Sequence, residues 1–188
     1  MSPDPLAPIR NPLPPDGKPP FVSLFQFVAT TDNAPYYCVP EALRFRGEVC
    51  GGEEKICNYI RDMAQHGADR VAAVLGTSVM DDGMDWCKGQ GGLRDCALAN
   101  IKLPLPIDVD GGVGMQEVDE IRNWMELQLI EKYNGFACIY DYKGEFWARV
   151  SGQIYLELSD FEWLGGVLQA LCTAVMAGDH RKRQRSRL

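Results

Sequence analysis

Apolar positions along this chain recur at two different spacings, and the two spacings predict helices and strands. In residues 53–75 the apolar side chains fall three, four and seven positions apart, which places them on one face of a long helix. Gly76 is placed to end that helix, because glycine readily takes the left-handed conformation found after a helix. Further helices are predicted over residues 39–49, over 116–133, and from 159 to about 176. In the last of these, Ser159 and Glu162 have the spacing of a capping box.

Strands are predicted over residues 96–103, 136–141 and 145–156. Pro104 and Pro106 are expected to end the first strand, because proline cannot donate a hydrogen bond to a neighbouring strand. The other two form a hairpin, and Gly144 in the turn between them can take a positive φ. This order of elements predicts an α+β fold: a small, mainly antiparallel sheet with helices on one face, preceded by a long helix.

The second strand of the hairpin has two different faces. Alternation puts an apolar set on one face and a set with polar groups on the other. The apolar set is Phe146, Ala148, Val150, Gly152, Ile154 and Leu156, and the polar set is Trp147, Arg149, Ser151, Gln153 and Tyr155. Arg149 matters most, since a guanidinium can make two parallel hydrogen bonds to a carboxylate. On the pattern alone, Arg149 is either a surface or ion-paired arginine or the anchor of an anionic ligand.

Proline content, predicted elements and charge divide the chain into three regions. Eight of its twelve prolines lie in the first 20 residues, so residues 1–20 are expected to form an extended arm. Residues 21–178 contain all the predicted helices and strands and are expected to form one domain with linking helices. Residues 179–188 are strongly basic and are expected to be a disordered tail.

Composition narrows the possible partners. The net charge of −7 argues against a nucleic-acid partner, because phosphate contacts need a basic face. Because no apolar run is long enough to cross a bilayer and the N-terminus lacks a signal peptide's apolar segment, we expect a cytoplasmic protein with no membrane partner. The seven cysteines and two histidines are scattered, so no metal site is expected. Asp81, Asp82 and Asp85 could bind a cation, although a solvated loop is the commoner role for such a cluster.

Three segments of the chain carry a resemblance to a known family. They read FVSLFQFVATTDNAPYYCVPEALRF, GGEEKICNYIRDMAQHGADRVAAVLGT and FWARVSGQIYLELSDFEWLGGVLQAL. From residue 21 to 177 the chain resembles the C-terminal part of class V aminotransferase-like enzymes, in the fungal isopenicillin-N-epimerase-like or hercynylcysteine-sulfoxide-lyase-like branch. These are pyridoxal-phosphate enzymes of fold type I. The resemblance therefore implies the small C-terminal domain of such an enzyme, a small amino-acid substrate, and a homodimer in the full-length form.

The resemblance also assigns two site residues. In the family, a turn similar to ATTDNAP carries a threonine that contacts the cofactor phosphate, which is Thr30 here, with Ala29 where the family usually has glycine. A strand similar to RVSGQIY carries the arginine that holds the substrate's α-carboxylate, which is Arg149 here. No catalytic residue is implied on this chain, because the lysine that binds pyridoxal phosphate precedes the threonine turn in the family. The one lysine before Thr30 is Lys18, in a proline-flanked segment.

Two functions are compatible with these residues. The first is the C-terminal part of a pyridoxal-phosphate-dependent C–S lyase-like or epimerase-like enzyme, inactive alone because the lysine and the large domain are absent. The second is a stand-alone, non-catalytic small-domain module that binds a small carboxylate or a full-length paralogue.

Overall fold

The computed structural model describes residues 19, 21–22, 32–84, 92–108 and 111–181. The chain divides into two compact units, Met1–Phe45 and Arg46–Leu188, and each is considered by itself. The described part of the first unit contains the short helix α2 (Ala34–Tyr37) and the beginning of α3 (Val39–Glu48). Neither helix has a buried residue. Among the described residues, those that form a hydrophobic core all lie in the second unit.

A three-stranded antiparallel sheet forms the centre of the second unit. Its spatial order is β1 (Leu98–Pro106), β3 (Glu145–Ser151), β2 (Cys138–Tyr142), so the strand that carries Arg149 is the central one. The turn of the β2–β3 hairpin has positive φ at Lys143 (53°) and at Gly144 (75°). Two successive positive φ values are the mark of a type I′ turn, which suits the right-handed twist of a hairpin.

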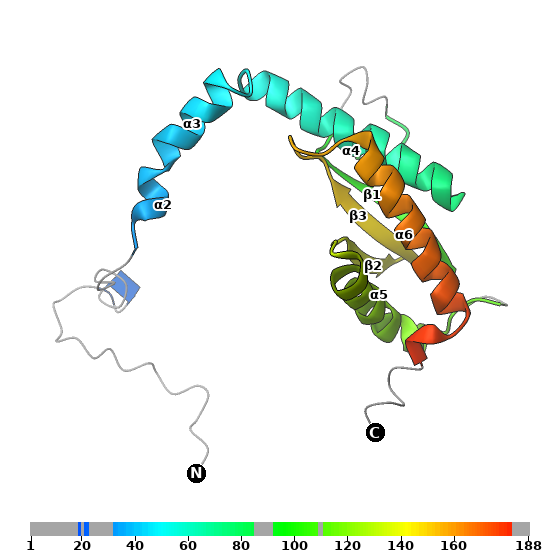
Figure 1. Cartoon of the computed structure of the whole chain (residues 1–188). Coiled ribbons are helices and arrows are strands. Elements are labelled where there is room, and N and C mark those ends of the chain that lie inside the picture. The colour runs from blue at the N-terminus through cyan, green and yellow to red at the C-terminus, as the bar shows by residue number, and fades with distance from the viewer. Residues whose placement is uncertain (1–18, 20, 23–31, 85–91, 109–110, 182–188) are drawn as a thin grey trace, which may run out of the picture. The chain divides into compact units, whose positions relative to one another are not determined.

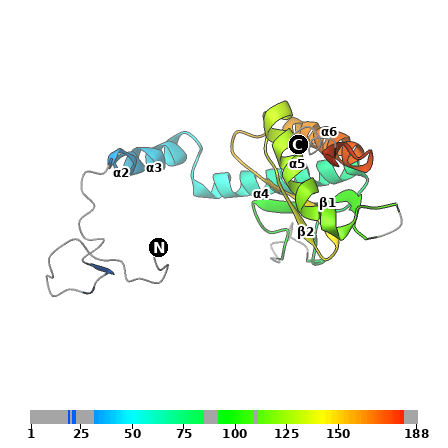
Figure 2. The ribbon, with the colours of Figure 1, turned by 90° about the horizontal axis from the view of Figure 1, so that it is seen from below.

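Helices pack against the apolar side of this sheet. The long helix α4 (Glu53–Leu75) and α6 (Leu158–Met176) run side by side and both contact β1 (Figure 1). The 3₁₀ helix η2 (Met115–Glu117) leads into α5 (Val118–Tyr133), which packs against β2 and lies beside α6 (Figure 2). Fully buried side chains from sheet and helices meet in one core, among them Val71, Ile101, Ile121, Met125, Leu129, Ile139, Phe146 and Leu168. This arrangement confirms the predicted α+β class and the predicted long helix.

The first strand is longer than predicted, because β1 continues through Pro104 to Pro106. The expectation that these prolines end it is wrong. Regular pairing of β1 with β3 is interrupted between Lys102 and Pro106, so Pro104 lies where the ladder needs no donor. On the opposite edge of β1, the N–H of Lys102 donates to the carbonyl of Ser78 at 2.9 Å. Prolines are tolerated in a strand at such an interruption.

The third strand is shorter than predicted, because β3 ends at Ser151 and not at residue 156. Gly152 lies directly against α4, where a Cβ atom would be 1.7 Å from the carbonyl oxygen of Ile60. From this contact the chain leaves the sheet. The assignment of Ile154 to the buried face is therefore wrong, and its side chain is exposed.

The predicted end of α4 is confirmed by the structure, and the predicted beginning of α6 is not. As predicted, α4 ends at Gly76 in the left-handed conformation (φ 65°). The predicted capping box of Ser159 and Glu162 is wrong, because α6 begins earlier, with Glu157 as its N-cap. There the N–H of Glu157 donates to the carboxylate of Asp160 at 2.8 Å. In the described residues, none of the helices combines the length and the apolar character that a membrane crossing would require.

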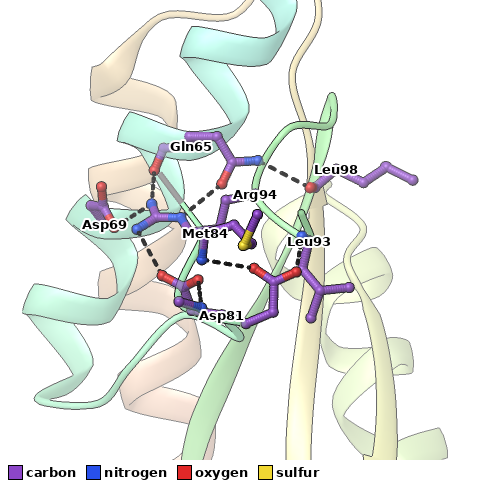
Figure 3. Close-up of polar contacts among 9 residues, drawn as sticks. Gln65, Asp69, Asp81, Met84, Leu93, Arg94 and Leu98 are labelled. Atoms are coloured by element: carbon purple, nitrogen blue, oxygen red, sulfur yellow. Dashed lines mark hydrogen bonds and ion pairs between the residues drawn. The ribbon is translucent and has the colours of Figure 1, made fainter. Parts of the chain in front are cut away.

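Arg94 ties the segment before β1 back to α4 (Figure 3). Its guanidinium donates to the carboxylate of Asp69 at 2.7 Å and to the side-chain oxygen of Gln65 at 3.1 Å. Gln65 is fully buried, and its amide donates to the backbone oxygens of Cys96 at 2.8 Å and Leu98 at 3.2 Å. Because a buried amide is costly unless it is hydrogen-bonded, this network fixes where β1 begins relative to α4.

Candidate functional site

A groove of about 600 Å³ opens where the end of β3 meets the beginning of α6. It is lined by the α5–β2 connection, the start of β2, the end of β3 with the residues that follow it, and the first turns of α6. Its side chains include Phe136, Arg149, Ser151, Gln153, Tyr155 and Trp163. The volume is within the range of about 300–1,000 Å³ that is usual for sites that bind small molecules.

Arg149 projects from the face of β3 opposite to the core. Its neighbours along the strand, Ala148 and Val150, are buried, whereas Arg149 is exposed. Across the sheet it is flanked by Asn100 on β1 and by Cys138 on β2. The central strand therefore presents the guanidinium between two residues without a formal charge.

Arg149 differs from the other arginines among the described residues in having no carboxylate partner. Each of the others pairs with an aspartate or a glutamate; they are Arg44, Arg46, Arg61, Arg70, Arg94, Arg122 and Arg181. Arg149 has neither a hydrogen bond nor an ion pair from its side chain to any described residue. An exposed guanidinium on a rigid central strand is thus available to an anionic ligand.

The positive charge of Arg149 also acts on Tyr140, which lies on β2. Burial raises the pKa of the Tyr140 phenol above its usual value, and the charge of Arg149 opposes this by lowering it. Because the net shift is upward, the phenol stays protonated at neutral pH. Tyr140 therefore does not neutralise the charge of Arg149.

Two contacts with α4 fix the segment that follows β3. Gly152 packs on the backbone of Ile60, and its N–H donates to the carbonyl of Ala97 at 2.9 Å. The hydroxyl of Tyr59 donates to the carbonyl of Leu156 at 2.7 Å. The long helix thus holds both ends of the short stretch that lines the groove beyond β3.

The structure brings several residues of the predicted polar face together. Arg149, Ser151, Gln153 and Tyr155 all line the groove, although β3 itself ends at Ser151. Trp147, the remaining member, does not line it. Its side chain is only 8% exposed, and its indole N–H donates to the carbonyl of Tyr142 at 3.3 Å.

Phe136 and Trp163 are among the groove residues that were not identified from the sequence, and one predicted site residue lies outside the described residues. Phe136 and Trp163 lie far apart along the chain and line one groove because the α5–β2 connection passes close to α6, where a Cβ atom at Gly135 would lie 3.1 Å from the ring of Trp163. The sequence did contain a signal for Trp163. It is a large apolar side chain that lies off the buried face of α6, where a polar residue would be usual. Thr30, predicted to contact a cofactor phosphate, lies outside the described residues and stays a prediction.

The groove suits a carboxylate better than covalent attachment of pyridoxal phosphate. The lysines among the described residues are Lys55, Lys102, Lys132 and Lys143, and none of them lines the groove. Lys102 forms an ion pair with Glu145 on the sheet. Since a Schiff base requires a lysine amine beside the cofactor aldehyde, the described residues do not fit that attachment, and no catalytic step is derived through the cofactor.

Asp81 and Asp82, which follow α4, accept hydrogen bonds from backbone N–H groups of the loop in which they lie. The carboxylate of Asp81 accepts a hydrogen bond from the N–H of Gly83 at 2.8 Å, and that of Asp82 accepts one from the N–H of Leu93 at 2.9 Å. Asp85 lies outside the described residues. No group of three or more His, Cys, Asp or Glu side chains that could hold a metal ion occurs within the described ranges.

Comparison with known proteins identifies relatives of this chain. It is 38% identical over 167 residues to the L-cysteine desulfhydrase-like protein lolT2 of Epichloe uncinata, a match that covers 84% of this chain and 36% of that protein. It is 37% identical over 166 residues to lolT1 of the same organism, covering 83% of this chain and 37% of that protein. The hercynylcysteine sulfoxide lyase of Schizosaccharomyces pombe is 32% identical over 145 residues, covering 76% of this chain and 30% of the lyase.

These matches confirm the resemblance that the sequence motifs carry. The chain spans little more than a third of the length of the relatives it matches. No family model matches it.

Proposed function

We infer that this chain, a relative of the pyridoxal-phosphate-dependent fold type I enzymes of the cysteine-desulfhydrase-like and hercynylcysteine-sulfoxide-lyase-like branch, supplies the carboxylate-binding part of an active site. The reaction proposed for the whole enzyme is cleavage of a carbon–sulfur bond in a small amino-acid substrate. The names of the relatives support this reaction, since one is a sulfoxide lyase and two are desulfhydrase-like.

The observation that carries the proposal is the unpartnered guanidinium of Arg149 in the groove. Its planar fork can donate two charge-assisted hydrogen bonds, one to each oxygen of an α-carboxylate, which fixes the orientation of the amino acid as well as its position. The neighbouring Asn100 and Cys138 bring no carboxylate to compete for that fork. Arg149 therefore binds and orients the substrate, and it takes no part in proton transfer.

The cofactor is proposed to be held mainly by residues other than those of the groove. Thr30 remains the candidate contact for its phosphate, by a hydroxyl and a backbone N–H that can both donate. The lysine for the Schiff base and the large domain are proposed to belong to a longer form of the enzyme, which would be a cytoplasmic homodimer. On this proposal the 188-residue chain is inactive alone.

The role of Arg149 can be tested on the full chain by NMR-monitored titration with L-alanine and with L-alaninamide, which lacks the carboxylate. We expect L-alanine, and not the amide, to shift the resonances of Arg149 and its neighbours. Arg149→Ala should weaken L-alanine binding by about tenfold or more, since hydrogen bonds to charged groups contribute about 1.5–3 kcal/mol. Arg122→Ala, which removes an arginine paired with Asp119 elsewhere, is the matched control. Equal binding of L-alanine by Arg149→Ala and the native chain would exclude the proposed role.

The inactivity of the chain alone has a separate test. We expect no visible absorbance band that survives dialysis after mixing with pyridoxal phosphate, and no lysine modified by the cofactor after hydride reduction. A stable band, traced by mass spectrometry to one lysine, would contradict this part of the proposal.

A further inference from the structure

Tyr140 lies next to Arg149 on the face of the sheet that is opposite to the core. In the β2–β3 register Tyr140 faces Trp147, two positions along β3 from Arg149. Its chain neighbour Ile139 is buried in the core, so alternation puts the phenol on the same face as the guanidinium. Cys138, which faces Arg149 directly, lines the groove, and Tyr140 is the next residue of β2 on that face. The charge of Arg149 is close enough to act on the phenol, so the two side chains are neighbours.

The hydroxyl of Tyr140 is a hydrogen-bond donor without an acceptor among the described residues. The sheet contains two carboxylates, and both are already paired. Glu145 forms an ion pair with Lys102 on β1. Asp141 lies 3.8 Å from the guanidinium of Arg122 on α5. The phenol and the neighbouring guanidinium on β3 are therefore two donors that no carboxylate of the sheet satisfies.

A carboxylate bound at Arg149 would have lone pairs left for a third donor. The guanidinium fork uses one lone pair on each oxygen, and each oxygen has a second one. Tyrosine and arginine are both long side chains, so from neighbouring strands their polar ends can reach a similar height above the sheet. The phenol also keeps its proton, because burial raises the pKa of Tyr140 above its usual value.

We propose that Tyr140 donates a hydrogen bond to the carboxylate that Arg149 holds, so that each strand of the hairpin supplies one side chain to the anion. The proposal rests on the proposed function, because it takes Arg149 to bind that carboxylate. A hydrogen bond from a neutral donor to a charged acceptor contributes more than one between neutral groups. Loss of the hydroxyl should therefore weaken carboxylate binding by about tenfold.

The first measurement is the affinity of the full chain for L-alanine, by NMR titration at pH 7. Tyr140→Phe removes the hydroxyl and keeps the ring, and we expect it to raise the Kd for L-alanine about tenfold. Tyr142→Phe is the matched control, because this exposed tyrosine lies on the same strand and the same face but pairs with Glu145, further from Arg149. The control should bind L-alanine as the native chain does.

The second measurement is a readout that a purely structural role of Tyr140 would not change. With labelled tyrosine rings, NMR follows the deprotonation of the phenol against pH, and Tyr140→Phe identifies its signal. A bound carboxylate makes that deprotonation harder, because two negative charges would then lie side by side. We expect saturating acetate to raise the pKa of Tyr140, and uncharged acetamide to leave it unchanged.

The outcomes separate this proposal from the proposed function. If Tyr140→Phe binds L-alanine as tightly as the native chain while Arg149→Ala does not, the role of Tyr140 is wrong and that of Arg149 stands. If Tyr140→Phe binds more weakly but acetate leaves the titration of the native phenol unchanged, the hydroxyl does not contact the anion and the proposal also fails. L-Alanine binding that is independent of Arg149, or that is undetectable at the highest concentration, would overturn both proposals.

Discussion

Replacing Gly152 by alanine should destabilise the chain more than the same replacement at Gly67 or Gly166. A Cβ atom at this position would lie 1.7 Å from the carbonyl oxygen of Ile60 and 3.0 Å from the backbone nitrogen of Ala64. Both are backbone atoms in the middle of α4, so no side chain can rotate away to make room. The φ of Gly152 is not positive, and the cost is therefore steric rather than conformational.

The size of this effect follows from the contact that must be relieved. Overpacking in a well-packed interior costs about 1–3 kcal/mol and occasionally more. Because the overlap here is between backbone and backbone, we expect about 3 kcal/mol or more, which corresponds to a fall in Tm of about 6–12 °C for a chain of this size. By comparison, alanine at Gly67 would lie 2.5 Å from the ring of the buried Phe161, so it should also destabilise the chain, but by displacing a side chain and not the backbone of a helix.

The assay is thermal and urea unfolding of the full chain, followed by far-UV circular dichroism. Gly166→Ala is the matched control, because its Cβ atom would meet nothing within 4 Å on the exposed side of α6. Alanine is the better helix former, so the control should gain about 0.5–1 kcal/mol. If Gly152→Ala unfolds at the same temperature as the native chain, the close approach of β3 to α4 is not as described.

Three further predictions concern buried and paired groups. Burial raises the pKa of the Cys172 thiol to about 12, so iodoacetamide at pH 8 should leave it unmodified while the exposed cysteines react; mass spectrometry that finds Cys172 labelled as fast would contradict this. Hydrogen bonds from Arg181, the strongest cause, lower the pKa of Glu117 to about 2, so its contribution is complete above about pH 4.5 and is lost as the pH falls toward 2. Glu117→Gln should therefore cost about 1 kcal/mol at pH 7 and much less near pH 2, and an equal cost at both values in urea unfolding would refute this. Arg94→Ala leaves the buried side-chain oxygen of Gln65 without its donor and should cost about 1–3 kcal/mol by the same assay, whereas an unchanged midpoint would show that the network is unimportant.

The helices and the fold class could be predicted because their signals are local. The apolar spacing of residues 53–75 and the glycine that follows specify α4 from its own sequence, and the structure agrees at both ends. The turn at Gly144 is likewise a local signal that the structure confirms. In each case the residues that decide the conformation are neighbours in the chain.

The strand ends could not be predicted because distant residues decide them. β1 passes through Pro104 because the regular pairing with β3 is interrupted there, so no backbone N–H is needed at that position for a hydrogen bond to β3. β3 stops at Ser151 since α4 presses on Gly152, and nothing in the sequence near Gly152 refers to Ile60. Alternation alone continues the strand to residue 156, which is where the prediction is wrong.

The early end of β3 also explains why the sequence indicated Arg149 but not its groove. Alternation needs only the neighbours of Arg149 to place the guanidinium on the face away from the core, and Ala148 and Val150 are indeed buried. The groove requires the chain to leave the sheet at Gly152, so that Tyr155 comes to line the same space as Trp163 of α6. If the strand had continued to residue 156, Tyr155 would extend the flat face of the sheet and the groove would lose that wall. The contact at Gly152 therefore shapes the site, and a substitution there should weaken ligand binding even under conditions in which the chain remains folded.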